Sequence, residues 1–255
     1  MPVQSAREPT EQQLKAMGTY CSLMDELRAR LQWIEYAANG RTGMDRQLVL
    51  EFGLLQLRMI VELIALGCLV AHGDIAESKG ALSRKAGADE ILNKLEQLHP
   101  DFYPVASVEA GRGEQGERRF KGRDPDYMTK PQLLQLYRRD CGNGLHRGSL
   151  KNLLGGRQPA RKGYPELMQP AQRIANLLAF HQISLIDGDS LLLCHLVDPV
   201  EQKAKVSFAT AFGSWQPPPA GPSDEPSGGA IVGLDGRSAF ASSRGDEPGN
   251  GTAGS

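Results

Sequence analysis

Apolar residues recur at helical spacing through the first part of the chain. From Thr10 onward they follow one another every three or four positions, which predicts one stripe of a long amphipathic helix. Thr10 and Gln13 form a capping-box pattern at its start, and Asn39-Gly40 provides a natural end. A second run, at about 44–72, is apolar over much of its circumference and is therefore expected to be central. The short turn between the runs predicts an antiparallel helical hairpin.

Three further helices follow from the same reasoning. One is expected at about 88–98, and another opens at Thr129, where Gln132 again completes a capping box. The last spans about 165–181 and contains Pro170. Because proline lacks a backbone N–H, we expect this helix to be kinked or divided there.

After the last helix the apolar period changes from that of a helix to that of a strand. Two short apolar runs flank Asp187-Gly188-Asp189, and residues 203–212 alternate, which predicts an antiparallel meander at about 182–212. The glycine-rich, charged stretch 101–128 has no helical period. It is expected to be a loop that could include a small hairpin from Tyr103 to Phe120.

These elements predict a mainly α protein, an antiparallel bundle of four to five helices with a small C-terminal antiparallel β meander. At 255 residues, the chain is long enough for one sizeable domain, which we place at 1–213. Proline, glycine, serine and acidic residues dominate 214–255, so this tail is expected to be disordered.

Composition narrows the classes of protein to consider. Charged residues make up 23% and the net charge is −1, so the chain as a whole is not drawn to nucleic acid or membrane. The most apolar run, 63–71, is shorter than the roughly 20 residues that a membrane span needs. The first residues lack the apolar core of a signal peptide. We therefore expect a cytoplasmic protein without a membrane contact.

The cysteines give no sign of a disulfide framework or of a metal site. They stand at 21, 68, 141 and 194, and reduced thiols are expected in a cytosolic protein. Cys141 with His146, and Cys194 with His195, match no usual zinc-ligand spacing. No metal or other cofactor is expected, and Cys194-His195 is expected to have no chemical role.

The stretch "LYRRDCGNGLHRGSL", residues 136–150, carries the candidate chemistry. On an α-helix at 100° per residue, Arg139, Asn143 and His146 lie within about 60° of one another. They point away from an expected core stripe of four residues, Leu134, Tyr137, Cys141 and Leu145.

This stretch resembles the signature of HEPN domains (higher eukaryotes and prokaryotes nucleotide-binding). In that signature an arginine and a polar residue precede a histidine, with four to six residues between the arginine and the histidine. Here Arg139 is followed by Asp140, and six residues separate Arg139 from His146. Gly142 and Gly144 depart from the pattern, since each lowers helix propensity by about 1 kcal/mol relative to alanine.

HEPN domains are bundles of four or five helices, and many are metal-independent ribonucleases that act as dimers in toxin–antitoxin or phage-defence systems. The resemblance implies a similar activity here, with His146, Arg139 and Asn143 as catalytic residues. Four residues are expected to assist binding: Asp140, Arg138, Arg147 and Glu62. The resemblance also implies that Glu62, on the central helix, approaches His146. The alternative for Glu62 is an ion pair with Arg58, four residues earlier.

Cleavage of RNA without metal uses the 2′-hydroxyl of the substrate as nucleophile. Histidine can move the proton near neutral pH, and arginine can hold the charged phosphate. Asn143 could orient the imidazole or the phosphate. Because one chain supplies few such groups, a homodimer is expected, with RNA or another phosphate-bearing ligand and an antitoxin protein as partners.

Charge is unevenly distributed along the chain. Residues 111–163 contain 13 lysines and arginines against five aspartates and glutamates, a net charge of +8. This favours a phosphate-bearing partner. The segment has no aromatic-rich strand surface of the kind that stacks bases. Two plainer interpretations remain open: a solvated polar helix face without function, and a non-catalytic helical module that binds a protein or a nucleotide.

Overall fold

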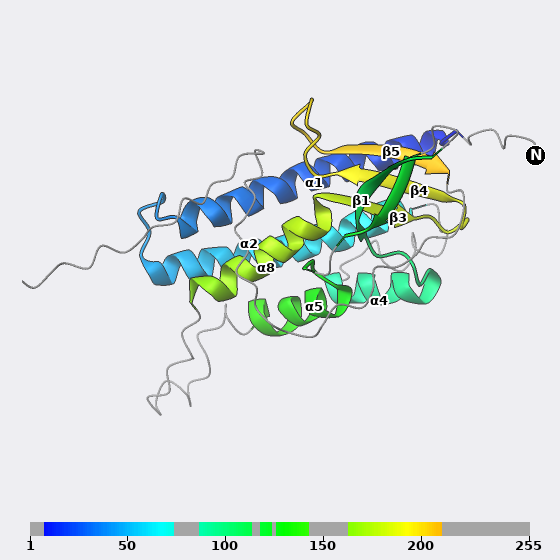
Figure 1. Ribbon diagram of the computed structural model, residues 1–255. Coiled ribbons are helices and arrows are strands. Elements are labelled where there is room, and N and C mark those ends of the chain that lie inside the picture. The colour runs from blue at the N-terminus through cyan, green and yellow to red at the C-terminus, as the bar shows by residue number, and fades with distance from the viewer. Residues whose placement is uncertain (1–7, 74–86, 114–117, 124–125, 143–162, 211–255) are drawn as a thin grey trace, which may run out of the picture.

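The computed structural model describes residues 8–73, 87–113, 118–123, 126–142 and 163–210 (Figure 1). In chain order, its elements are α1 (Glu11–Ala38), α2 (Arg46–Ala71), α4 (Ala88–Leu98), β1 (Val105–Arg112), β2 (Arg118–Gly122), α5 (Lys130–Gln135), η1 (Leu136–Cys141), α8 (Tyr164–Leu178), β3 (Phe180–Ser184), β4 (Ser190–His195) and β5 (Lys205–Thr210). The described part of the protein is therefore mainly helical, with one antiparallel sheet.

Helices α1 and α2 form the predicted antiparallel hairpin (Figure 1). The capping box of α1 is present: the Gln13 backbone N–H donates to Thr10 Oγ1, and the Thr10 N–H donates to Gln13 Oε1. Asp45 caps α2 by accepting from the Gln47 N–H at 2.8 Å. These bonds satisfy backbone donors that have no partner within the first helical turn.

Helix α2 is central, as its apolar composition predicted. Thirteen of its residues are buried, among them Leu57, Ile60, Val61 and Ile64. By length and composition alone the 26-residue helix could cross a membrane, but 56% of its most apolar window is buried inside the protein. The run 63–71 is only part of this helix, which is apolar over a longer stretch than that run indicates.

The five strands form one antiparallel sheet in the order β2-β1-β3-β4-β5. The predicted meander is confirmed as β3, β4 and β5. The stretch around 103–120, expected to be a loop with at most a small hairpin, forms strands β1 and β2. Because β1 also pairs with β3, the hairpin and the meander are one sheet rather than two separate pieces.

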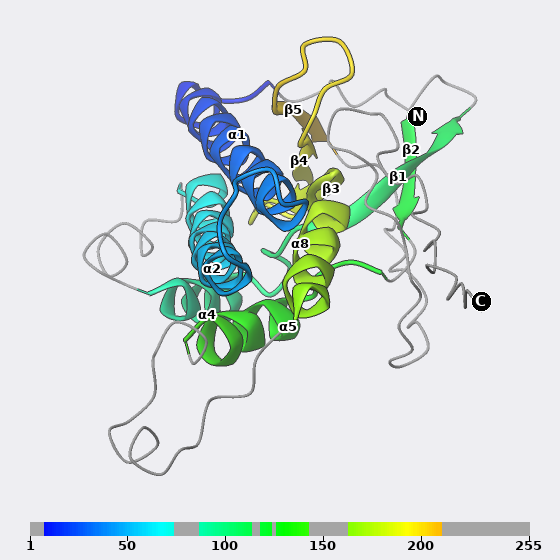
Figure 2. The same cartoon turned by 90° about the vertical axis from the view of Figure 1, so that its left-hand side faces the viewer.

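Helices α1 and α8 lie along one side of the sheet, and the β1–β2 hairpin extends away from them (Figure 2). Successive residues of a strand point to opposite faces. His181 of β3 faces the helices, where it contacts Tyr20 of α1. Its neighbour Phe180 therefore belongs to the opposite face, which we call the outer face of the sheet.

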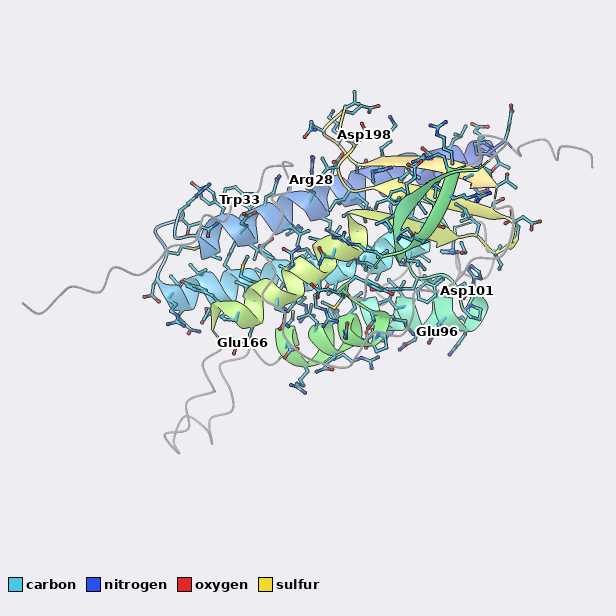
Figure 3. All side chains as sticks on the ribbon, in the orientation of Figure 1. Arg28, Trp33, Glu96, Asp101, Glu166 and Asp198 are labelled. Carbon is cyan, nitrogen blue, oxygen red and sulfur yellow. The ribbon has the colours of Figure 1, made fainter. Side chains whose placement is uncertain are left out.

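The turn between β4 and β5 is attached to α1. Arg28 donates to the backbone oxygen of Gln202, and Asp25 accepts from the Ala204 N–H at 3.0 Å. Figure 3 shows Asp198, in the same turn, above Arg28 of α1. These contacts fix the last strand against the first helix.

Two predictions about helices need correction. Helix α8 is not divided at Pro170, which corrects one of the two predicted forms (kinked or divided); residues on both sides of the proline, such as Leu167 and Ala171, are buried in the core and hold the helix together. The chain also leaves this helix three residues before the predicted end and enters β3 at Phe180. The predicted tail, 214–255, lies outside the described residues.

Candidate functional site

The motif lies on a π-helical segment rather than on a regular α-helix. After α5, residues Leu136–Cys141 form η1, with i→i+5 hydrogen bonds. The projection at 100° per residue was therefore wrong for this turn. The buried residues are Leu133, Leu136 and Cys141, whereas Leu134 and Tyr137 of the predicted stripe are only half-buried. A π-helical turn is rare and is frequently found at functional sites.

The first glycine of the motif does not end the helix. Gly142 has φ −59° and ψ −57°, which are helical values. Asn143, His146 and Arg147 lie outside the described residues. Of the predicted site, the structure therefore places Arg138, Arg139, Asp140 and Glu62.

The two arginines of η1 differ in their surroundings. The Arg138 guanidinium donates to the Asp89 carboxylate of α4 at 3.0 Å. The Arg139 side chain is 69% exposed, and its Nε lies 3.9 Å from the neighbouring Asp140 carboxylate. A pair at this distance and exposure constrains a side chain little. Arg139 is thus the more available of the two for a phosphate.

Glu62 faces the motif helix and pairs with Arg58 at the same time. It accepts from the Tyr137 hydroxyl at 3.3 Å and from Arg58 Nε at 3.4 Å. The Arg58 guanidinium lies over the Tyr137 ring, 5.2 Å from its centroid. Burial, and after it the Glu62 carboxylate, raises the pKa of Tyr137, so its hydroxyl keeps the proton that it donates. The expected ion pair is present but half-exposed.

Glu62 belongs to an exposed stripe on α2 that is otherwise leucine. Leu48, Leu55 and Leu66 are 53%, 45% and 41% exposed. With Glu62 they are separated by seven, seven and four residues, which puts all four on one side of the helix. The stripe extends about 27 Å along α2. We call these three residues the leucine stripe. Exposed leucines aligned along one side of a helix are candidates for an interaction surface.

Three of the four cysteines, Cys68, Cys141 and Cys194, are buried thiols, whereas Cys21 is half-buried. No disulfide joins the four, all of which are in the described part of the chain. Burial raises the pKa of the Cys68 thiol to about 12 and that of Cys194 well above its usual range. Among the described residues, no three histidines, cysteines or acids are grouped so that they could hold a metal ion.

The outer face of the sheet carries a row of aromatic rings that the sequence did not predict. Phe120 of β2 lies 5.4 Å from Phe180 of β3, and Phe180 lies 4.5 Å from His195 of β4, between ring centroids. We call these three residues the aromatic row. Because they come from three separate stretches of the chain, no local pattern could have brought them together. The only local signal was the alternation of the strands themselves.

Comparison with family models, with curated proteins and with solved structures gave no match to this chain.

Proposed function

We propose that the protein is a metal-independent ribonuclease of HEPN type that acts as a homodimer. The main support is the exposed guanidinium of Arg139 on a π-helical turn directly before the segment that contains His146. A π-helical turn is less favourable than regular helix, and such turns are frequently retained where they direct side chains at functional sites.

In this proposal Arg139 binds the phosphate next to the bond that breaks, and its charge stabilises the transition state. His146 takes the proton from the 2′-hydroxyl or returns it to the leaving oxygen, because its usual pKa lies near neutral pH. Asn143 orients one of these groups. Asp140, Arg138 and Arg147 assist binding, and Glu62 positions the motif helix through Tyr137 rather than taking part in the reaction.

The leucine stripe is where a second copy would bind. The stripe continues on both sides of Glu62, the residue that contacts Tyr137 of η1. A symmetric dimer formed through this surface would therefore hold two copies of η1 near the same interface. That arrangement would supply two arginines and two histidines to a shared site, which one chain cannot do.

The alternative is a non-catalytic helical module that binds a phosphate-bearing ligand or a protein through the same surface. The exposure of Arg139 is compatible with it, because an exposed guanidinium can bind a phosphate without any group that moves a proton. Arg139 would then bind without cleaving.

RNA cleavage in excess EDTA distinguishes these functions. We expect the purified wild-type protein to cut single-stranded RNA, and Arg139→Ala and His146→Ala to lower the rate about 10²- to 10³-fold. Arg41→Ala, which removes the same charge at the α1–α2 turn, is the matched control and should cleave normally. RNA left intact by every protein would support the binding module instead. Activity abolished by EDTA would contradict the metal-independent mechanism.

The oligomeric state tests the dimer separately. Leu55→Glu places a charge in the leucine stripe, and we expect it to give a monomer by sedimentation analysis and to abolish cleavage. Leu14→Glu is the matched control, because Leu14 is 53% exposed but lies on α1. A monomeric wild-type protein that still cleaves RNA would show that the stripe has another role.

A further inference from the structure

The outer face of the sheet contains a second feature with the chemistry of a nucleic-acid site. The aromatic row crosses from β2 to β4, and its three side chains are half-buried rather than enclosed in the core. The Phe120 and Phe180 rings meet across β1, which separates their strands. Ser107 of β1, which pairs with Gly122 of β2, is only 1% exposed, as expected of a small residue under these rings.

Cations gather beside the row on the β1–β2 hairpin. We call Arg112 and Arg118 the hairpin cations; both are exposed and lie on the face that carries Phe120, whereas Arg119 and Lys121, each one position from Phe120, belong to the opposite face. The one acid among them in the described hairpin is Glu109, which pairs with Arg118 at 2.9 Å. The Arg118 guanidinium also lies over the Phe120 ring, 5.1 Å from its centroid, and so joins the cations to the row.

The register of the hairpin places the two hairpin cations directly opposite each other. Arg112 of β1 pairs with Arg118 of β2. Like charges in a cross-strand pair repel, and here the Glu109 carboxylate, which pairs with Arg118, offsets part of that repulsion. Two guanidinium groups and one carboxylate still leave a net positive charge, which a bound phosphate can neutralise. The hairpin is also at the edge of the sheet, where an extended ligand can reach it (Figure 2).

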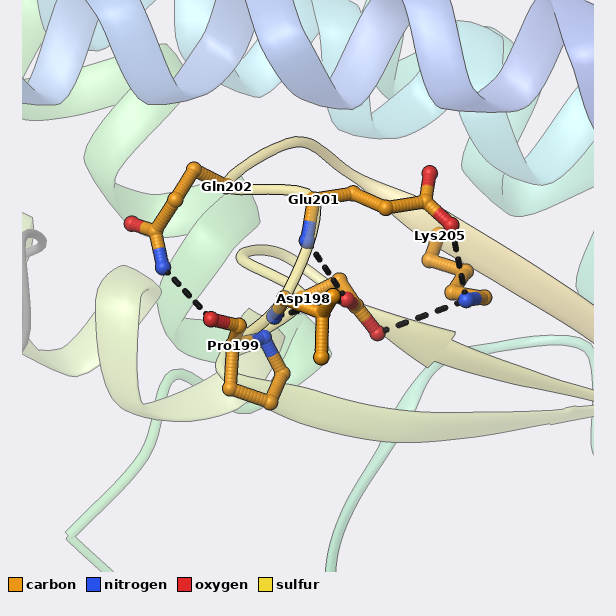
Figure 4. A network of polar contacts seen from close by, with 6 residues as sticks. Asp198, Pro199, Glu201, Gln202 and Lys205 are labelled. Carbon is orange, nitrogen blue, oxygen red and sulfur yellow. Dashed lines mark hydrogen bonds and ion pairs between the residues drawn. The ribbon is translucent and has the colours of Figure 1, made fainter.

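Acidic residues mark the far end of the row. His195 pairs in register with Lys205 of β5, and the Lys205 ammonium is held by Glu201 and Asp198 at 2.9 and 3.7 Å (Figure 4). The Asp198 carboxylate accepts from the Val200 and Glu201 N–H groups and shapes the turn. Burial, and after it the charge of Arg118, lowers the pKa of His195, so its ring is neutral at neutral pH. Phosphates are therefore attracted to the hairpin end, and bases to the neutral rings.

We infer that the aromatic row and the hairpin cations form a binding site for single-stranded RNA, with bases stacked on Phe120, Phe180 and His195 and phosphates on the hairpin. Stacking on aromatic side chains beside a cationic groove is the general means of binding single strands. The inference rests on the proposed function only for the choice of RNA as the ligand. It corrects the expectation that the basic segment has no aromatic strand surface, because the other two rings come from β3 and β4.

Binding of a fluorescent 2′-O-methyl RNA 12-mer tests the site without dependence on cleavage, because the nucleophilic hydroxyl is blocked. We expect Phe120→Leu and Phe180→Leu each to weaken binding about ten-fold by fluorescence anisotropy, since leucine keeps the packing but cannot stack. Arg112→Gln should reduce the slope of log affinity against log salt by about 0.7, as expected for one lost phosphate contact. Circular dichroism at the same temperature confirms that each variant is folded.

Tyr36→Leu is the matched control. Tyr36 is an exposed aromatic residue of α1, and the Arg41 guanidinium lies 5.8 Å from its ring centroid. It therefore gives an arginine–aromatic pair like that of Arg118 and Phe120, but outside the sheet. We expect it to bind RNA as the wild type does.

Several outcomes would overturn the inference: equal affinity of folded ring variants and wild type, or equal affinity for the single strand and for a duplex of the same sequence. If Phe120→Leu and Phe180→Leu changed only the oligomeric state and not RNA binding, the outer face of the sheet would be a self-association surface instead. Single-stranded DNA bound as tightly as RNA would overturn the choice of RNA. Binding through the aromatic row without any RNA cleavage would contradict the proposed ribonuclease but would still support this RNA-binding site.

Discussion

His72 and His181 are two fully buried histidines whose surroundings differ in one chemical respect. His181 Nε2 lies 2.7 Å from the Tyr20 hydroxyl and its Nδ1 lies 3.0 Å from the Leu178 backbone oxygen. His72 Nδ1 lies 2.8 Å from the Cys68 oxygen and its Nε2 lies 3.0 Å from the Ser184 oxygen. His181 therefore has a hydroxyl partner, which can donate or accept a hydrogen bond. The two partners given for His72 are backbone carbonyls, which can only accept.

This difference decides which contacts a neutral ring can make at each site. A neutral His181 satisfies both contacts by donating from Nδ1 to Leu178 and accepting at Nε2 from Tyr20. Burial lowers the pKa of His181 to about 4, against a smaller opposite effect of the Leu178 carbonyl. A neutral His72 can donate to only one carbonyl, and its second nitrogen would then face an oxygen lone pair.

The two sites show that equally buried histidines can differ in the hydrogen-bond partners that surround them. His72 lies at the C-terminal end of α2, where the helix dipole favours a cation. His99, at the end of α4, contacts the same Ser184 oxygen at 2.9 Å, so two helix ends meet the end of β3. His181 lies in the sheet, against Tyr20, and its Nδ1 also meets the C-terminal end of α8 at the Leu178 oxygen, so the two sites differ in the Tyr20 hydroxyl rather than in the helix end.

The largest expected effect is the acid sensitivity that His181 confers. Its folded pKa of about 4 is below the ordinary value of 6.5, so the unfolded chain binds the proton first. Stability is therefore fully present above about pH 6.5 and is lost as the pH falls toward 4, by about 3 kcal/mol in total. Urea denaturation between pH 4 and 7 measures it. In His181→Phe this part of the pH dependence should disappear, and an unchanged pH profile would contradict the assignment.

A smaller effect is expected when Tyr20 loses its hydroxyl. In Tyr20→Phe the buried Nε2 of His181 has no donor, which should lower the free energy of unfolding by about 1–2 kcal/mol at pH 7. Tyr36→Phe is the control on the same helix, because Tyr36 is exposed, and it should change stability little. Equal stability of all three proteins would show that the Tyr20–His181 hydrogen bond is not maintained in solution.

The smallest effect is expected at His72. In His72→Phe the ring no longer donates to the Cys68 or Ser184 oxygen, which should lower the free energy of unfolding by about 1 kcal/mol. Urea denaturation at pH 7 measures it. Equal stability of His72→Phe and the wild type would show that these carbonyl contacts contribute little.

Much of the helical framework could be predicted from the sequence. The helix at 88–98 and the caps at Thr10 and Thr129 are where their local patterns put them. The π-helical turn could not be foreseen, because a change from i→i+4 to i→i+5 bonding leaves the same residue types in the same order. The undivided α8 could not be foreseen either, because packing on both sides of Pro170 outweighs the one hydrogen bond that proline removes.

The candidate site was predictable only in part. Arg139 on an exposed turn and the ion pair of Glu62 with Arg58 follow from spacing along a helix. The contact between Glu62 and Tyr137 joins residues 75 positions apart, so only the packing of η1 on α2 decides it. The aromatic row has the same origin, since pairing of β1 with β3 brings the basic hairpin to the two rings of the meander.

The sequence by itself therefore determined which segments are helices and strands and which of their faces are apolar, because periodicity, caps and turns act over a few neighbouring residues. Only the tertiary structure decided which polar and aromatic groups meet, and with them the hydrogen-bond partners of each buried histidine. The physical reason is that a hydrogen bond or a ring contact depends on distances of a few ångströms. Between segments far apart in the chain, those distances are fixed only when the core packs.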